Sequence, residues 1–166
     1  MLKENNAQEI EGILAKYPPD QKRSAVMPLL FLAQREYGLL SPEVIIEVGD
    51  LLGLESTEVA SLVGFYTLYH DREGGKYRIQ VCTDLPCALR GAQAFADELC
   101  DKLDIRMGAT TPDGQVTVEE VKCLAACDRA PIFQLQEPNG IHYHEDQSVG
   151  SALAFIEALR VKGQVD

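Results

Sequence analysis

The chain has 166 residues, 46% of them hydrophobic, and a formal net charge of −11 at pH 7. This length suits one sizeable domain or two small ones, and so acidic a chain repels phosphate backbones, which excludes nucleic acid as an expected partner. No stretch approaches the length of a membrane span and the polar N-terminus lacks the apolar segment of a signal peptide, so we expect a cytoplasmic protein without direct membrane insertion.

Short helices are predicted for residues 1–74. Apolar side chains recur at helical spacing in residues 7–17 and 23–37. Ser41-Pro42-Glu43 is typical of a helix start, because it supplies a hydroxyl cap, a proline in the first turn and then an acid. Gly53 is expected to end that helix and Ser56 to cap the next one. Four short helices with short links predict a small helical bundle.

A polar, glycine-containing segment at residues 71–75 is the expected boundary, which assigns residues 75–166 to a second domain. Its expected elements follow in chain order: a strand at 77–81, a helix at 88–103, a strand at 116–121, two strands at 132–136 and 141–144 around the hairpin signal Pro138-Asn139-Gly140, and a closing helix at 148–161. This order predicts an α/β (α+β) fold of thioredoxin-like type.

Four of the five cysteines form two pairs: four residues separate Cys82 from Cys87, and three separate Cys123 from Cys127. Clustered cysteines in a reducing compartment point to metal or redox chemistry rather than to disulfides. Each pair follows a predicted strand, so one sheet can bring the four thiolates together. Such a set can hold zinc or an iron–sulfur cluster, and the absence of two-residue knuckles favours a 2Fe-2S cluster. A zinc-stabilised thioredoxin-like binding module remains the alternative from another class.

Three cations lie near the cysteines in sequence, Arg90, Lys122 and Arg129, and either offset the charge of a cluster or are ordinary surface charges. Cys100 lies outside both pairs and is expected to be a small buried apolar residue. His142 and His144 share one face of a predicted strand and could chelate a metal there, but a plain surface strand is the favoured interpretation.

The segments 82–91 and 121–131 resemble the small 2Fe-2S subunit of NADH:quinone oxidoreductase, also called the 24-kilodalton subunit of respiratory complex I. Residues 63–67, Val-Gly-Phe-Tyr-Thr, and residues 111–114, Thr-Pro-Asp-Gly, also resemble that family, so the resemblance covers nearly the whole chain. One departure is Ala125, where the family usually has glycine. Alanine carries strain there if the residue needs a positive φ and is harmless if the residue is helical.

The resemblance implies a helical domain followed by a thioredoxin-like domain in which Cys82, Cys87, Cys123 and Cys127 bind one 2Fe-2S cluster. It also implies docking against a flavoprotein subunit that binds FMN and NADH, as a heterodimer within a larger complex on the inner face of the membrane. The chain has no dinucleotide-binding fingerprint, so we expect an electron-transfer subunit without an NADH site or catalytic residues of its own. Similar subunits serve NAD-linked hydrogenases and formate dehydrogenases, and the sequence leaves this alternative open. A free ferredoxin is disfavoured, because a shuttle has no evident need for the bundle. Exposed aromatics such as Tyr66 and Tyr69 would make the bundle a docking surface.

Overall fold

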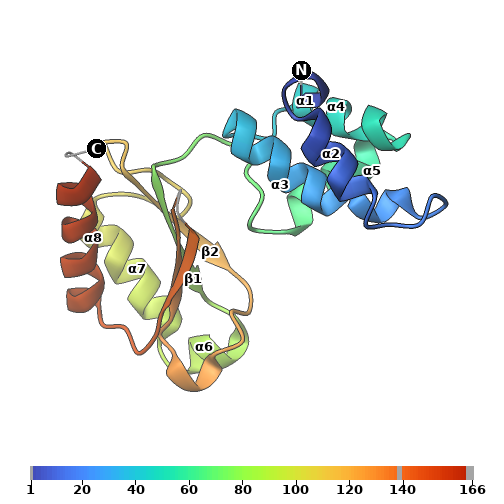
Figure 1. Cartoon of the computed structure of the whole chain (residues 1–166). Helices are drawn as coiled ribbons and strands as arrows, with labels where there is room; N and C mark the ends of the chain where they lie inside the picture. The colour runs from blue at the N-terminus through green and yellow to red at the C-terminus, as the bar shows by residue number, and fades with distance from the viewer. Residues whose placement is uncertain (1, 138–139, 164–166) are drawn as a thin grey trace. The chain divides into compact units, whose positions relative to one another are not determined.

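The computed structural model describes residues 2–137 and 140–163 (Figure 1). The chain divides into two compact units, Met1–Glu73 and Gly74–Asp166, and each is described on its own. Within the described residues, no helix is both long and apolar enough to cross a bilayer.

The first unit is the predicted helical bundle. Its helices in chain order are α1 (Leu2–Asn5), α2 (Ala7–Leu14), the 3₁₀ helix η1 (Lys22–Ala25), α3 (Val26–Tyr37), α4 (Pro42–Leu52) and α5 (Ser56–Phe65). Each of the long helices turns an apolar stripe inward, as helical spacing requires. The core that they enclose includes Leu29, Leu30, Ala33, Val48 and Val59, all of which are fully buried.

Two of the three helix caps predicted in this unit are confirmed, those at Ser41 and Gly53. The Ser41 hydroxyl accepts a hydrogen bond from the Val44 backbone N–H, as predicted. Gly53 ends α4 in the left-handed conformation, with a φ of 66°. The prediction that Ser56 caps α5 is wrong, because Ser56 is already helical and the extended Glu55 takes the cap position without a side-chain hydrogen bond.

Aromatic side chains gather at the end of α5. Phe65 is 76% exposed, and its ring centroid lies 5.0 Å from that of Tyr66, which is partly exposed. Tyr69 was expected at the surface, but it is buried and its hydroxyl donates to the Met27 carbonyl oxygen at 3.1 Å. Burial, together with Tyr66, raises the pKa of Tyr69 to about 12. Tyr69 therefore belongs to the core of the bundle, whereas Phe65 and Tyr66 are exposed at the end of α5.

The second unit has the predicted mixed fold. Its strands are β1 (Tyr77–Cys82), β2 (Val116–Val121), β3 (Phe133–Glu137) and β4 (Gly140–His144), and its helices are α6 (Leu85–Leu89), α7 (Ala92–Leu103), the 3₁₀ helix η2 (Cys127–Arg129) and α8 (Val149–Gly163). Over the described residues the strands form one sheet in the order β2-β1-β3-β4, in which β1 and β2 are parallel and the other pairs are antiparallel. Helices α7 and α8 cover one face of this sheet (Figure 1).

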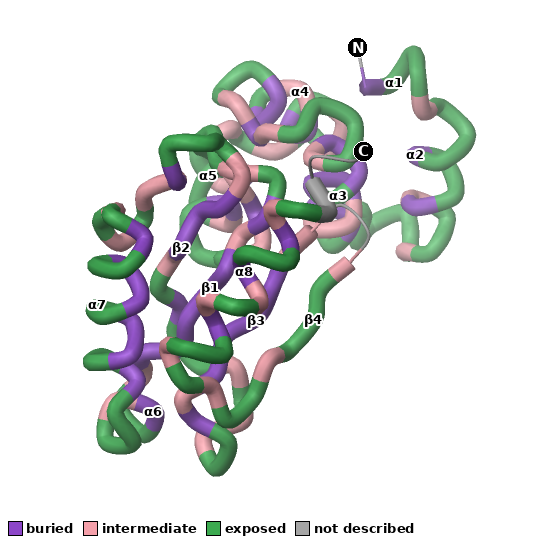
Figure 2. Tube along the Cα trace, turned by 90° about the vertical axis from the view of Figure 1, so that its left-hand side faces the viewer, coloured by how far each residue is buried: buried purple, intermediate pink, exposed green. Residues whose placement is uncertain are grey.

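The pattern of burial follows these layers. Figure 2 shows β1 and β3 as buried strands and α7 as a helix with one buried and one exposed side. Phe95, Leu99 and Ile156 of the helices pack against Ile79 and Val118 of the sheet. This core fixes the sheet, and the sheet fixes where its strand ends lie.

One predicted element of this unit differs from the structure, and another lies partly outside the described residues. The single helix predicted at residues 88–103 is divided into α6 and α7, because Gly91 adopts a φ of 90° that interrupts helical hydrogen bonding. The predicted hairpin residues Pro138 and Asn139 lie outside the described residues, and the strands on either side of them pair antiparallel, with Glu137 opposite Gly140.

Candidate metal centre

The sheet register brings two cysteine-bearing segments to one edge. Cys82 is the last residue of β1 and stands opposite Val121, the last residue of the parallel strand β2. The segments that follow these residues therefore start side by side, and the Thr83 backbone N–H donates to the Val121 carbonyl oxygen at 3.2 Å. One segment runs into α6 and the other into η2, which lie at the same end of the sheet (Figure 1).

Three of the four paired sulfurs gather in a small apolar cluster. Cys82 and Cys87 are each 1% exposed and pack with Ala92, Ala130 and Ile132, and Cys127 at the start of η2 packs against the same cluster. The thiol of Cys87 is within hydrogen-bonding reach of the thiols of Cys82 and Cys127. The structure therefore brings together Cys82, Cys87 and Cys127.

Cys123 takes a different position. Its side chain is exposed, while its backbone N–H and that of Leu124 donate to the sulfur of Cys82. Cys123 and Ala125 both have positive φ values, 62° and 58°, so this loop folds back over the end of β1. The left-handed conformation is the strained outcome foreseen for alanine at position 125.

The pKa values of the two buried thiols are shifted in opposite directions. Burial opposes ionisation of Cys82, but hydrogen bonds from the backbone N–H groups of Asp84 and Leu124 outweigh it and lower the pKa of this thiol. Burial and the neighbouring Cys82 sulfur raise the pKa of Cys87 to about 12. The site thus stabilises one thiolate and disfavours a second beside it, and a bound cationic centre would remove that repulsion.

The donor set fits a binuclear cluster. A 2Fe-2S cluster takes two thiolates at each iron, and backbone N–H groups that point at sulfur are typical of its surroundings. The chain supplies one pair of thiols from each segment and such N–H groups at Cys82.

The remaining candidate residues have separate roles. Cys100 is buried in the core between α7 and the sheet, and burial raises its pKa, as expected of a packing residue. His144 is half-buried rather than a surface residue, because its ring lies 4.8 Å from Phe133 and 4.2 Å from Phe155, centroid to centroid. His142 instead contacts Glu137, with Nε2 3.4 Å from a carboxylate oxygen.

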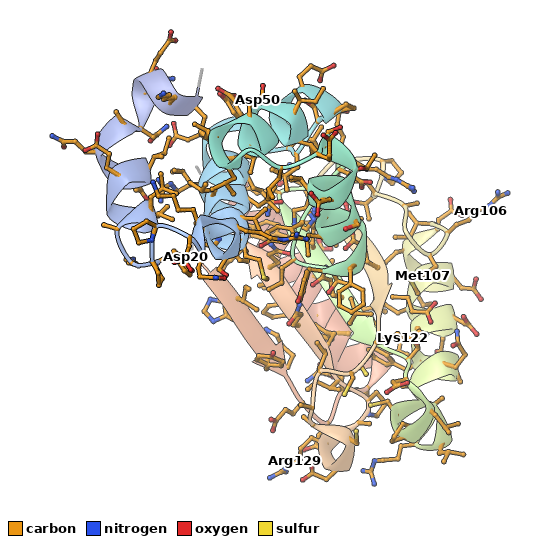
Figure 3. All side chains as sticks on the ribbon, turned by 90° about the vertical axis from the view of Figure 1, so that its right-hand side faces the viewer. Asp20, Asp50, Arg106, Met107, Lys122 and Arg129 are labelled. Atoms are coloured by element: carbon orange, nitrogen blue, oxygen red, sulfur yellow. The ribbon has the colours of Figure 1, made fainter. Side chains whose placement is uncertain are left out.

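The three cations near the cysteines each contact a protein group. Arg90 Nε donates to the Ala130 carbonyl oxygen at 3.3 Å. Arg129, labelled in Figure 3 on η2, donates to Asp146 at 3.0 Å. Lys122 donates to the hydroxyl of Thr83 at 2.9 Å and also contacts Glu120.

Thr83 and Glu120 are the residues of this site that the sequence expectations missed. The Thr83 hydroxyl donates to the Glu120 carboxylate, and hydrogen bonds first from Lys122 and then from Thr83 lower the pKa of Glu120. Thr83 adjoins Cys82 and Lys122 adjoins Cys123, but only the pairing of β1 with β2 reveals that the two neighbours meet.

Comparison with known proteins connects this geometry to a family. The family model described as "Thioredoxin-like [2Fe-2S] ferredoxin" matches residues 10–160. An NADH-quinone oxidoreductase subunit of Rhizobium meliloti is 40% identical over 158 residues, which cover 95% of this chain and 90% of that protein. The NADH-quinone oxidoreductase subunit 2 of Thermus thermophilus is 43% identical over 128 residues, with 77% and 71% coverage.

A solved structure shares the fold. A chain in the crystal structure of an NAD+-reducing [NiFe]-hydrogenase in the air-oxidized state superposes with a TM-score of 0.63 at 20% sequence identity. The match covers 81% of this chain, which spans only 23% of the length of the hydrogenase chain. The mixed fold, the gathered cysteines and the family match over residues 10–160 confirm the resemblance seen in the sequence: the chain belongs to the thioredoxin-like [2Fe-2S] ferredoxin family.

Proposed function

We propose that the chain is the electron-transfer subunit of an NADH:quinone oxidoreductase and that Cys82, Cys87, Cys123 and Cys127 hold one 2Fe-2S cluster. The observation that carries this proposal is the meeting of the two cysteine-bearing segments at the ends of β1 and β2, with backbone N–H groups directed at Cys82. The names and identities of the two relatives support the choice of complex. When bound, such a cluster supplies reversible one-electron chemistry.

Each segment then has a defined role in holding the cluster. Cys82 and Cys87 would hold one iron, and Ala92, Ala130 and Ile132 pack around them and keep water away. Cys123, which is exposed, and Cys127, which is partly buried, would hold the other iron. The N–H groups that point at Cys82 stabilise negative charge on the buried sulfur. A redox partner can approach from the exposed side.

The partner in this proposal is a flavoprotein subunit that carries the FMN and NADH sites, so that the chain itself binds no NADH. The two would form a heterodimer within a larger complex at the inner face of the membrane. Large apolar side chains are exposed where such a partner could bind: Leu85 and Leu89 on either side of Cys87, and Phe65 in the helical bundle. We assign partner binding to residues 1–74 and to α6, and cluster binding to residues 75–166.

A second parent complex remains a candidate. The shared fold with a chain of an NAD+-reducing hydrogenase favours an equivalent role in an NAD-linked hydrogenase, and a formate dehydrogenase is the related possibility. The partner that co-purifies with the chain distinguishes these complexes. Co-purification with a hydrogenase large subunit, and not with subunits of a quinone oxidoreductase, would assign the chain to a hydrogenase instead of an NADH:quinone oxidoreductase.

Metal analysis of the anaerobically purified protein tests the proposal. We expect a reddish-brown protein with about two irons and about two acid-labile sulfides per chain. The Cys87→Ser variant should lose both, whereas Cys100→Ser, which changes a buried thiol outside the site, should keep them. Colourless protein with one zinc per chain would instead establish the zinc-stabilised module.

A further inference from the structure

Three polar side chains connect the segment after Cys82 to the segment before Cys123. Lys122 Nζ donates to the Thr83 hydroxyl oxygen at 2.9 Å, and that hydroxyl donates to the Glu120 carboxylate. Lys122 also contacts Glu120 directly. The hydroxyl of Thr83 is therefore both an acceptor and a donor, and both of its partners belong to the other segment.

The position of Thr83 is fixed by its backbone as well. The side chain is only 6% exposed, and the backbone N–H donates to the Val121 carbonyl oxygen at 3.2 Å. A buried hydroxyl with both hydrogen-bonding functions used is held in one rotamer. Glu120 and Lys122, by contrast, are two residues apart on the same segment, so their mutual contact cannot join the two segments without Thr83.

A second connection lies at the other end of the site. Arg90, at the end of α6, donates through Nε to the carbonyl oxygen of Ala130, just after η2. The segments 82–90 and 120–130 are therefore joined beyond Cys87 and Cys127 as well as between Cys82 and Cys123. Each connection crosses from one cysteine pair to the other.

We propose that Thr83 is a positioning residue that, through Glu120 and Lys122, holds the two cysteine pairs at the separation a binuclear cluster requires. The inference depends on the proposed function, because it assumes that the four cysteines bind the cluster. Each segment contributes one pair, so movement of one segment against the other changes the distance between the two iron positions. Groups outside the ligand set that orient ligands in this way strongly affect metal affinity.

The test compares Thr83→Val with Thr83→Ser in the cluster-loaded full chain. Valine has nearly the shape of threonine but no hydroxyl, so Glu120 and Lys122 keep only each other, whereas serine preserves the connection. We expect Thr83→Val to release iron to a chelator about tenfold faster than the wild type and to alter the electron paramagnetic resonance spectrum of the reduced protein. Thr83→Ser should restore the wild-type rate and spectrum.

Wild-type release and a wild-type spectrum in Thr83→Val would overturn the inference while leaving the proposed function intact. A wild-type protein without iron would overturn the proposed function instead. If Thr83→Val fails to fold by circular dichroism, the double variant Glu120→Ala/Lys122→Met decides, because it removes both partners of the Thr83 hydroxyl and both side chains are at least partly exposed. Faster iron release in this double variant supports the positioning role, and an unchanged rate refutes it.

Discussion

Cys82 and Cys87 lie in regular structure, the first at the end of β1 and the second on α6, and both are buried. Cys123 and Cys127 lie in a loop and a 3₁₀ turn, and the loop includes two residues with positive φ. The two halves of the site supply the same chemical groups, but the buried half is positioned by the sheet and its core. The other half, called the exposed half because Cys123 is exposed while Cys127 is partly buried, depends on a loop with left-handed residues and on side-chain connections to the buried half.

This difference predicts which half solvent can reach. The side chain of Cys123 is exposed, so small molecules have access to the iron that it would ligate. Cys87 is enclosed by apolar side chains, and a molecule in solution cannot take its place without opening the cluster of Ala92, Ala130 and Ile132. The two halves should therefore respond differently when a ligand is removed.

The largest expected effect is on cluster content. Cys87→Ala and Cys123→Ala should each lower the iron content to about a tenth of the wild type or less, because each removes one thiolate ligand. Adding a small thiol such as 2-mercaptoethanol during reconstitution should restore the visible absorption of Cys123→Ala but not that of Cys87→Ala. The measurement is iron, labile sulfide and absorbance of both variants with and without the thiol.

The control for this comparison is Cys100→Ala, which should hold the wild-type amount of iron under both conditions, since Cys100 packs in a different core. Equal rescue of the Cys87 and Cys123 variants would contradict the division into a buried and an exposed half. If the added thiol restored the absorption of Cys87→Ala but not that of Cys123→Ala, the assignment of the buried and exposed halves would be reversed.

A smaller effect is expected on association with the flavoprotein. Leu89 is 81% exposed two residues after Cys87, so a partner that approaches the site should bury it. Leu89→Ala should weaken binding at least about tenfold, measured by calorimetry with the purified partner. Val161→Ala, which trims an exposed side chain on α8, is the matched control and should bind normally. Normal binding by Leu89→Ala would move the docking surface away from α6.

Sequence patterns were sufficient for the strands and for the helical bundle, because apolar periodicity is a local property. They were insufficient where a backbone conformation determines the end of a helix, or where strand register determines which distant side chains meet. The apolar pattern runs on through Arg90 and Gly91, so it does not reveal that Gly91 separates α6 from α7. Thr83 and Lys122 are 39 residues apart, and only the register of β1 against β2 brings them together.

Ala125 illustrates the same limit at a single residue. The sequence leaves two outcomes open, harmless if the residue is helical and strained if its φ is positive, and the φ of 58° selects the second. The preceding and following cysteines do not determine that angle. It arises because the loop must direct the N–H groups of Cys123 and Leu124 back towards the Cys82 sulfur.

The smallest predicted effect tests that strain. Ala125→Gly should raise the free energy of unfolding of the metal-free protein by about 0.5–1 kcal/mol, since relief of the left-handed strain exceeds the entropy that glycine adds to the unfolded chain. Ala126 is the matched control: its φ is −131°, so Ala126→Gly gains no such relief and should lower the same free energy by about 0.5–1 kcal/mol. Urea unfolding of both variants measures the two changes. Opposite signs at adjacent alanines would locate the strain in the exposed half of the site, whereas destabilisation by both would mean that the left-handed turn at Ala125 costs the fold nothing.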